Sequence, residues 1–582
     1  MNFSAKVKFL ILIFSLGFIF IIAKLIFLQV FLAGNLSAQA NKEHFSILSI
    51  PANRGEIKTV DGFSLVSNKD AFLLYANLSK LTIDKKDITN KLAQILSVNM
   101  PLLATDSSRE KNQKVLEKKL EDKFNLKNVV WINLAHFVNK EIKRQIEELK
   151  IAGLGVVSEP ARDYPEASAA AHLLGFVGFD DTGNPKGYFG LEGFYDRELA
   201  GKPGELRQEK DALGRPIAIG SETRREEING SNLVLTIDRA VQRFTEKELQ
   251  KGIFQWKATG GTAMVMNPVT GAILAMASFP SYDPGNFIYY PSKFYKNPAA
   301  ADLFEPGSII KPLIMAAAIN ENKVTPETRC EACDGPKKIE TDYIHTFNNQ
   351  YHPNSTMTEI LINSDNTGIV FVGEKLGFVN LYNYLQKYGF SEKSGIDLQE
   401  EMTGALRGQN EYYPIDRATL TFGQGVVVNS LQMMRAWAVL ANGGYLVTPH
   451  LVQTIETRDK KIALSWLKKI RVISGNTAQI VKEMLVRVSR ESPIHFPLEQ
   501  IPELVNFKIA AKSGTAQIAL RGAYAKSGTI ASVIGYFPAD DPKFLVLVKL
   551  NEPEVRPWGS DTAGPIFFSI LRDLIMYYNI AP

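Results

Sequence analysis

The stretch EPGSIIKP, residues 305–312, decides the fold, because it places a serine and a lysine three residues apart behind a Pro-Gly turn. The apolar segment LIMAAAI (313–319) follows and is rich in strong helix formers. Ser308 is therefore expected at or near the N-terminus of a buried helix, on the face that Lys311 shares. Burial would lower the pKa of the lysine, so that its neutral amine accepts a proton. The pattern predicts a nucleophile with its base; the alternative is an N-cap serine beside a surface lysine.

The Ser-x-x-Lys spacing occurs twice more in the chain, so the spacing alone is a weak motif. Ser108–Lys111 lies in a charged run, and Ser465–Lys468 lies in a lysine-rich amphipathic stretch. Neither pair precedes a buried apolar helix, so both are interpreted as surface sequence. A nucleophile on a helix needs further partners, and two later motifs supply them.

The first of these motifs is SDN at 364–366, which follows the apolar segment EILIN. Ser364 and Asn366 are two residues apart in a predicted loop, so their side chains are expected to point into one cleft. There the Ser364 hydroxyl would relay a proton, and the Asn366 amide would hold a substrate carbonyl.

The second motif is KSGT, which occurs at 512–515 and again at 526–529. The first copy lies in an apolar-flanked strand pattern, where Gly514 would let a substrate backbone approach closely. The second copy is predicted to be loop sequence, at the entry to the next strand. The predicted site residues of this motif are therefore Lys512, Ser513, Gly514 and Thr515.

Composition bounds the class of protein. A chain of 582 residues is too long for one core, so two or three domains are expected. A hydrophobic content of 45% and a charged content of 22% are typical of a folded protein. The net charge is only +5, and no basic cluster is interleaved with aromatics, so nucleic acid is not expected as a partner.

Residues 9–31 are apolar except for three side chains and are long enough to span a membrane. An uncleaved anchor is favoured over a cleaved signal peptide, because the apolar stretch is long for a signal. Lys6 and Lys8 precede the span, and the next basic residue beyond it is Lys42. The positive-inside rule therefore places residues 1–8 in the cytoplasm and everything after the anchor outside, as a single-pass protein of the cytoplasmic membrane.

Cys330 and Cys333 are the only cysteines, and His345 and His352 follow them. Outside the cytoplasm a C-x-x-C pair can be oxidised. The sequence leaves three states open: a local disulfide, two reduced thiols, or a zinc site of the Cys2His2 type. A disulfide or free thiols are favoured over a metal.

The pattern along the chain indicates an α+β protein of several domains. Residues 44–225 alternate short strands with amphipathic helices, and the polar residues 205–232 connect them to a new unit. That unit opens with a strand, a helix and a hairpin, and it ends with three predicted antiparallel strands and a closing helix, at 508–520, 529–538, 543–552 and 567–578. This order favours an antiparallel sheet flanked by helices.

SxxK, SxN and K[ST]G occur in that order, with 56 residues from Ser308 to Ser364 and 148 from Ser364 to Lys512. With these motifs the chain resembles the class B penicillin-binding proteins, the monofunctional peptidoglycan D,D-transpeptidases of the FtsI and penicillin-binding protein 2 type. The resemblance extends over nearly all of the chain. The other segments that carry it are PANRGEI (51–57), ARDYPEASAAAHLLGFVG (161–178), GYFGLEGFYDRELAGKPG (187–204), AMVMNPVTGAILAMASFPSYDPG (263–285), FGQGVVVNSLQM (422–433) and ANGGYLVTPHLV (441–452).

The resemblance implies a fold. Behind the anchor it implies an elongated α+β pedestal of the penicillin-binding protein dimerisation type over 44–225. A transpeptidase domain like those of penicillin-binding proteins and β-lactamases would follow over 232–580. Ile309 and Ile310 depart from the family, where Thr with an aromatic residue or Met is commoner. The CEACDGP segment is not a general family feature.

The resemblance also implies a mechanism that needs no metal or other cofactor. Ser308, activated by Lys311, would attack the penultimate D-Ala carbonyl of a stem peptide and expel the terminal D-Ala. The backbone N–H groups of Ser308 and Thr515 would form the oxyanion hole. The amine of a neighbouring stem would resolve the acyl-enzyme, which makes a cross-link, and β-lactams would acylate the same serine.

The remaining roles follow in the same way. Ser364 and Lys512 would assist proton transfer to the leaving amine, and Thr515 with Asn366 would hold the donor peptide. The resemblance implies a glycosyltransferase of the SEDS family as a partner. The C-terminal tail favours septal over side-wall synthesis. Alternatives are a membrane-bound β-lactam sensor and a catalytically idle scaffold of the cell-wall machinery, against which the intact motif set argues.

Overall fold

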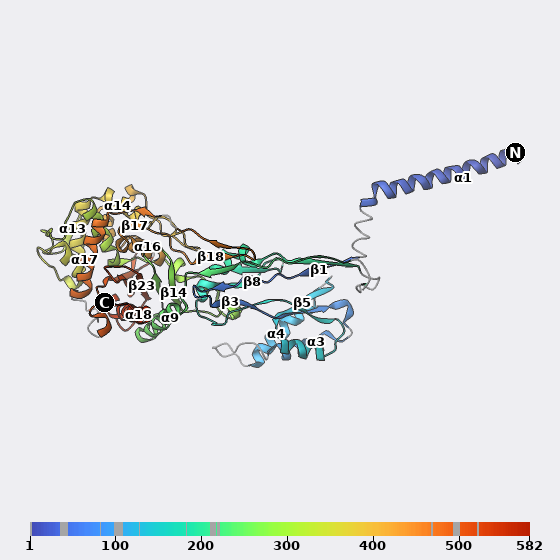
Figure 1. The fold of residues 1–582 in the computed structure, drawn as a ribbon, viewed down its shortest axis with the longest axis horizontal. Coiled ribbons are helices and arrows are strands. Elements are labelled where there is room, and N and C mark those ends of the chain that lie inside the picture. The colour runs from blue at the N-terminus through green and yellow to red at the C-terminus, as the bar shows by residue number, and fades with distance from the viewer. Residues whose placement is uncertain are drawn as a thin grey trace. The chain divides into compact units, whose positions relative to one another are not determined.

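The computed structural model describes residues 3–34, 45–81, 83–97, 109–126, 129–181, 183–209, 217, 222–466, 469–492, 501–520 and 523–582 (Figure 1). Ser108 and Lys468, which belong to the two other Ser-x-x-Lys pairs, lie outside these residues. The chain forms two compact units, and each is built from two separate stretches. The first unit comprises 1–53 with 201–230, and the second comprises 54–200 with 231–582.

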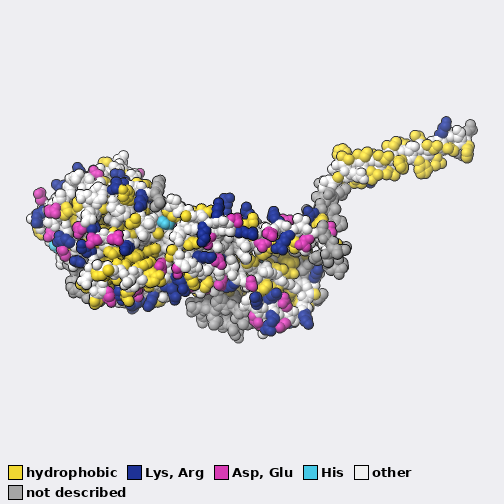
Figure 2. All heavy atoms as spheres, viewed as in Figure 1, with side chains coloured by type: hydrophobic (Ala, Val, Ile, Leu, Met, Phe, Trp, Pro, Cys, Tyr) yellow, Lys and Arg dark blue, Asp and Glu magenta, His cyan; other side chains and the backbone are white. Residues whose placement is uncertain are grey.

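The first unit contains the apolar N-terminal helix and a small antiparallel sheet. Helix α1 (Phe3–Ile26) continues into a π-helical turn, η1 (Phe27–Phe31). Its apolar part, Val7–Phe31, has a mean hydropathy of 2.8, and none of it is buried inside the protein (Figure 2). At about 1.5 Å per residue it is long enough to cross a bilayer core. The sheet has the order β1-β10-β11, with strands Phe45–Ile50, Gly204–Glu209 and Glu222–Arg225.

The second unit is organised around a five-stranded antiparallel sheet. Its order is β14-β13-β23-β22-β21, and the strands are Ile273–Phe279, Gly260–Met266, Phe544–Asn551, Ala523–Phe537 and Ala510–Leu520. The predicted hairpin is therefore the β13–β14 pair, and the three predicted C-terminal strands are β21, β22 and β23. The strand with the first KSGT copy, β21, lies at one edge of the sheet.

Both faces of this sheet are buried, because alternate residues of each strand enter different cores. In β13, Met264 packs into one core and Val265 into the other. Helices α9 (Arg239–Trp256) and α18 (Gly559–Tyr578) cover the Val265 face (Figure 1). Asp238 caps helix α9: its side chain accepts from the N–H of Ala240 at 2.9 Å. The closing helix was predicted to start at 567; it starts eight residues earlier.

A helical half covers the other face of the sheet. Its central helix, α11 (Lys311–Asn320), has no exposed residue before its last, which agrees with the predicted buried helix after Ser308. The indole of Trp437 donates to the carbonyl of Ile309 at 2.9 Å and holds the start of this helix from inside. The surrounding helices are α10 (Pro298–Ala301), α12 (Met357–Ile362), α13 (Asn366–Leu376), α14 (Phe378–Lys387), α15 (Pro414–Leu420), α16 (Ser430–Ala441) and α17 (Gly475–Glu491).

The second unit contains further sheets. A six-stranded sheet has the order β19-β18-β12-β2-β3-β7, with strands Lys461–Ala463, Val452–Glu456, Asn232–Leu235, Ile57–Lys58, Ser64–Lys69 and Ala161–Asp163. A three-stranded sheet has the order β5-β4-β6, with strands Trp131–Val138, Phe72–Asn77 and Leu154–Ser158. It packs on three helices, α3 (Lys85–Ser97), α4 (Arg109–Phe124) and α5 (Lys140–Glu148).

Short elements complete the unit. The two-stranded pairs are β8–β9 (Phe176–Phe179, Pro185–Tyr188), β15–β16 (Lys337–Ile339, Asp342–Ile344) and β17–β20 (Tyr445–Leu446, Ile470–Arg471). The short helices are α6 (Ala171–Leu174), α7 (Gly190–Phe194) and α8 (Asp196–Ala200). The 3-10 turns are Leu78–Lys80, Pro284–Tyr289, Ser292–Phe294, Gly307–Ile310, Phe347–Asn349, Gln409–Glu411 and Pro502–Leu504.

One prediction about the KSGT copies is wrong. The copy at 526–529 lies within strand β22 and not in a loop. The β21–β22 ladder extends past this copy, because Leu520 still pairs with Ala523. Local sequence favoured a loop there, whereas pairing with the long β21 strand extends the ladder to the end of the hairpin.

Three of the segments that resemble the family meet in one buried ionic cluster. Arg54 donates through Nε to Glu192 Oε2 at 2.6 Å, and Arg162 donates through Nε to Glu192 Oε1 at 2.8 Å. The Glu192 side chain has no exposed surface, and the two arginine side chains are at most 8% exposed. Asp196 pairs with Arg54 at 2.8 Å and adds a second negative charge. Each charge is thus compensated where water is excluded.

Replacing Glu192 by alanine should lower the free energy of unfolding of this unit by about 3–5 kcal/mol, because two buried guanidiniums lose their shared partner. Thermal or denaturant unfolding of the full chain in detergent would measure the loss. The matched control is Glu147→Ala, which removes an exposed partner 3.8 Å from Lys143. That control should change stability by less than about 0.5 kcal/mol. Equal stability of the two variants would contradict the prediction.

Candidate active site

Ser308 lies on a tight turn that two glycines make possible. The 3-10 turn η5 (Gly307–Ile310) leads directly into α11, and Gly307 has φ +59°, in the left-handed region that glycine tolerates. Its N–H donates to the carbonyl of Gly423 at 3.2 Å. A Cβ on Gly423 would lie within contact distance of the Gly307 carbonyl, which leaves no room for a side chain there. The turn is thereby held at the start of a buried helix, with Ser308 half-buried.

Strand β21 packs directly behind this turn. A Cβ on Gly514 would lie 2.9 Å from Ile309 Cγ2 and 3.1 Å from the Pro306 carbonyl oxygen. Gly514 was predicted to admit a substrate backbone; in the structure its missing side chain is what lets the Ser308 turn approach the strand. The glycine of KSGT therefore sets the distance between the first and third motifs.

Lys311 is completely buried, and its amine is held by the SDN motif. Nζ donates to the Ser364 carbonyl at 2.6 Å and to Asn366 Oδ1 at 2.7 Å, and Ser364 Oγ lies 3.3 Å from Nζ. Ser364 has φ +54°, a conformation that non-glycine residues rarely adopt. Within the described part of the chain, no hydrogen bond joins Lys311 to the Ser308 hydroxyl. The second motif, not the first, provides the acceptors for the amine.

Both lysines of the predicted site titrate far below a free lysine. Burial lowers the pKa of Lys311 well below its usual value, and the nearby charge of Lys512 lowers it further, whereas the Asp365 carboxylate opposes the shift. Burial also lowers the pKa of Lys512 to about 7. Lys512 is only 2% exposed and donates to the Ser513 carbonyl at 3.0 Å. Neutral amines are therefore available near neutral pH.

The SDN loop is fixed from two sides. Asp365 caps α13: its Oδ1 accepts from the Gly368 N–H at 3.1 Å and from the Thr367 hydroxyl at 2.8 Å. The amide nitrogen of Asn366 donates to the His345 carbonyl at 3.0 Å. That bond orients the amide so that Asn366 Oδ1 faces Lys311.

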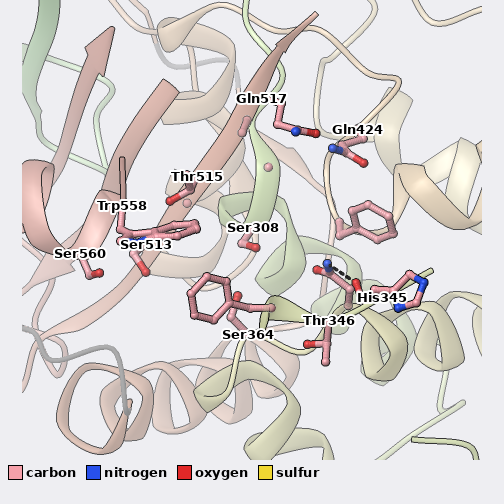
Figure 3. A pocket seen from close by; sticks show the side chains of 16 residues that line it. Ser308, His345, Thr346, Ser364, Gln424, Ser513, Thr515, Gln517, Trp558 and Ser560 are labelled. Carbon is pink, nitrogen blue, oxygen red and sulfur yellow. Dashed lines mark hydrogen bonds between the residues drawn. The ribbon is translucent and has the colours of Figure 1, made fainter. Parts of the chain in front are cut away.

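The three motifs line one cleft of about 620 Å³ (Figure 3). Ser308 lies at its centre, with Ser513 and Thr515 of β21 on one side and Ser364 on another. Lys311 and Lys512 do not line the cleft; they lie buried behind it. The lining residues are Gly307, Ser308, His345, Thr346, Phe347, Ser364, Asn366, Phe422, Gln424, Ser513, Gly514, Thr515, Ala516, Gln517, Trp558 and Ser560.

Sequence reasoning missed the aromatic part of this lining. Phe347 and Trp558 meet edge to face, with ring centroids 4.6 Å apart. They come from the segment before α12 and from the loop before α18, so no local pattern connects them. Thr515 Oγ1 accepts from the N–H of Gly559, directly after Trp558, at 3.0 Å, which ties β21 to the start of α18. The FGQG segment carries part of the family resemblance, but it gave no signal for these contacts.

The two cysteines are bonded to each other in the structure. Cys330 and Cys333 form a disulfide, so their sulfurs are bonded to each other. His345 Nδ1 lies 2.9 Å from the Tyr351 hydroxyl. Among the described residues there is no group of three or more His, Cys, Asp or Glu side chains arranged to hold a metal ion. The Cys2His2 alternative is therefore not assembled in this structure.

Comparison with known proteins shows the family of the chain. A family model described as "Penicillin binding protein transpeptidase domain" matches residues 261–572, and one described as "Penicillin-binding Protein dimerisation domain" matches residues 49–235. The chain belongs to the class B penicillin-binding proteins. Its function is peptidoglycan D,D-transpeptidation of the FtsI type.

Individual relatives of this penicillin-binding protein cover nearly its whole length. Stage V sporulation protein D of Bacillus subtilis is 30% identical over 99% of this chain and 86% of its own. The peptidoglycan D,D-transpeptidase FtsI of Buchnera aphidicola is 27% identical over 100% of this chain and 96% of its own. The crystal structure of penicillin-binding protein 2X from Streptococcus thermophilus matches with a TM-score of 0.70 at 22% identity, over 91% of this chain and 80% of that one. That likeness shows the shared α+β fold.

Substituting Gly514 by alanine should slow acylation by a penicillin on the order of 10²-fold, because the new methyl group pushes the Ser308 turn from β21. Stopped-flow acylation kinetics would measure this, with circular dichroism as the check on folding. Gly335→Ala is the control, because a Cβ there has nothing within 4 Å. A Gly514→Ala protein that acylates at the wild-type rate would show that the turn tolerates the displacement.

Proposed function

We propose that the transpeptidation runs through an acyl-enzyme on Ser308, with Lys311 as its base. The observation that supports this best is the burial of Lys311 beside the half-buried Ser308, with every acceptor of its amine supplied by the SDN motif. A fully buried amine favours the neutral form and accepts a proton readily. The Ser308 hydroxyl comes within reach of the amine when substrate orders the site, as catalytic hydrogen bonds often tighten only then.

The other motif residues act on the tetrahedral intermediate and on the leaving group. The backbone N–H groups of Ser308 and Thr515 receive the oxyanion. Ser364, which already touches the Lys311 amine, and Lys512 pass the proton to the departing D-Ala amine. Asn366 and Thr515 hold the donor peptide, with Ser513 and Gly514 along the same strand edge. A stem-peptide amine then attacks the Ser308 ester and forms the cross-link.

The setting of this reaction follows from the N-terminal helix and from the family. Residues 1–8 would lie in the cytoplasm, 9–31 would form the anchor, and the catalytic part would work outside the membrane. Residues 44–225 would act as the pedestal and 232–580 as the transpeptidase domain. We propose a SEDS-family glycosyltransferase as the partner that makes the glycan strand, β-lactams as covalent inhibitors, and a role in division.

Labelling with a fluorescent penicillin tests the nucleophile. Ser308→Ala should lose the label completely, because no hydroxyl remains to form the ester. Ser465→Ala removes an exposed serine with the same spacing to a lysine and should label as the wild type does. Unchanged labelling of Ser308→Ala would overturn the proposed function.

The rate of acylation should fall as the pH drops below about 7 and should not fall between pH 7 and pH 9. The sign follows from the lysines: burial lowers the pKa of Lys512 to about 7 and that of Lys311 well below its usual value. Below these values both amines gain protons, and a protonated amine cannot act as a base. A rate that is constant down to pH 5, or one that declines above pH 7, would be inconsistent with a neutral lysine base.

A further inference from the structure

The disulfide belongs to a segment that forms one wall of the cleft. This segment, residues 330–356, lies between α11 and α12 and contains the β15–β16 pair. Its residues 345–347 line the cleft, and the carbonyl of His345 holds the Asn366 amide at 3.0 Å. At its end, the Cys330 N–H donates to the Ser355 carbonyl at 2.8 Å, which closes the segment on itself. We call it the cysteine-hairpin segment.

The cysteine-hairpin segment also presents a histidine to the catalytic loop. His352 Nδ1 lies 4.0 Å from Asp365 Oδ2. Both atoms are buried, and neither has a hydrogen-bond partner among the described residues. The Asp365 side chain is 1% exposed, whereas 37% of the His352 side-chain surface is open to solvent. Two complementary polar atoms thus face each other behind the cleft at a separation slightly too long for a hydrogen bond.

Buried polar atoms without a hydrogen-bond partner are rare in folded proteins, and each one calls for a structural or functional explanation. The two oxygens of the Asp365 carboxylate differ: Oδ1 caps α13, whereas Oδ2 has no donor. Within the cysteine-hairpin segment, the His352 carbonyl accepts from the Ser355 hydroxyl at 2.8 Å. A shift of about 1 Å would bring the imidazole N–H into normal hydrogen-bond range of the carboxylate.

We propose that His352 is a positioning residue for the transpeptidation: in the reacting complex its Nδ1–H donates to Asp365 Oδ2 and holds the SDN loop against Lys311. Asp365 lies between Ser364 and Asn366, which supply all the acceptors of the Lys311 amine. Fixing Asp365 therefore fixes the acceptors on both sides of it. This inference rests on the proposed Ser308–Lys311 chemistry.

The same hydrogen bond has an electrostatic effect on the base. The charged groups that act on Lys311 are Lys512 of β21, which lowers its pKa, and Asp365, which raises it. A donor on Asp365 Oδ2 partly compensates the carboxylate and weakens its field at Lys311. His345 and Tyr351, two titratable residues of the cysteine-hairpin segment, contact each other at 2.9 Å. Loss of the His352 donor should therefore favour protonated Lys311.

Two substitutions of His352 separate this role from general folding. His352→Asn keeps an N–H donor near the position of Nδ1, whereas His352→Leu removes it at similar size. His136→Leu is the matched control, because it breaks another histidine–carboxylate contact: His136 of β5, which does not line the cleft, lies 2.8 Å from Glu159. The full-length proteins are acylated by a fluorescent penicillin, and the acylation rate constant k2 is separated from the dissociation constant Ks between pH 5.5 and 9. Saturating label counts the folded fraction of each variant.

His352→Leu should lower k2 at pH 7 by roughly three- to tenfold with Ks nearly unchanged, and should move the acid limb to higher pH by about half a unit or more. His352→Asn should restore k2 to within about twofold, and His136→Leu should match the wild type. Wild-type k2 in His352→Leu would overturn the proposal, as would an Asn variant as slow as the Leu variant. A loss of labelling that is explained entirely by a smaller folded fraction, with k2 of the folded protein unchanged, would also overturn it. Failure of the proposed function is distinguishable, because it would appear as labelling of Ser308→Ala.

Discussion

A lysine amine with no exposed surface must be given acceptors inside the protein, and the site is arranged around this requirement for Lys311. Leaving such a group unpaired costs several kcal/mol, which is on the order of the free energy of unfolding of a whole domain. The acceptors come from Ser364 and Asn366, so the loop before α13 must meet the first turn of α11. The left-handed backbone conformation of Ser364 and the N-cap hydrogen bond of Asp365 hold the loop in this position. The helix, the loop and the reactive turn are thereby fixed together.

Much of this was predictable from local sequence. Alternation and turn residues indicated the β13–β14 hairpin and the C-terminal strands, and the apolar run after Lys311 indicated a buried helix. The order of three weak motifs indicated which serine and which KSGT copy would line the same cleft. These signals work because each depends on neighbours a few residues away.

What could not be predicted depends on contacts between distant parts of the chain. Phe347 and Trp558 are joined only by the folded cleft, and no residue beside either one indicates the other. The Ser308 turn occupies the space that a side chain on Gly514 would fill, and no residue beside Gly514 indicates this contact. The second KSGT copy lies in a strand because pairing with β21 outweighs the local preference for a loop. Long-range packing decides all three.

The buried cluster of Arg54, Arg162 and Glu192 has a consequence for how such sequences can change. Both guanidiniums contact the same carboxylate, so replacing Glu192 by a neutral residue leaves Arg162 charged in the interior without its acidic partner, whereas Arg54 keeps Asp196. A neutral residue at position 192 therefore fits the fold only if an uncharged residue replaces Arg162 as well. Residue choices in segments far apart in the chain are thus coupled through the Glu192 carboxylate.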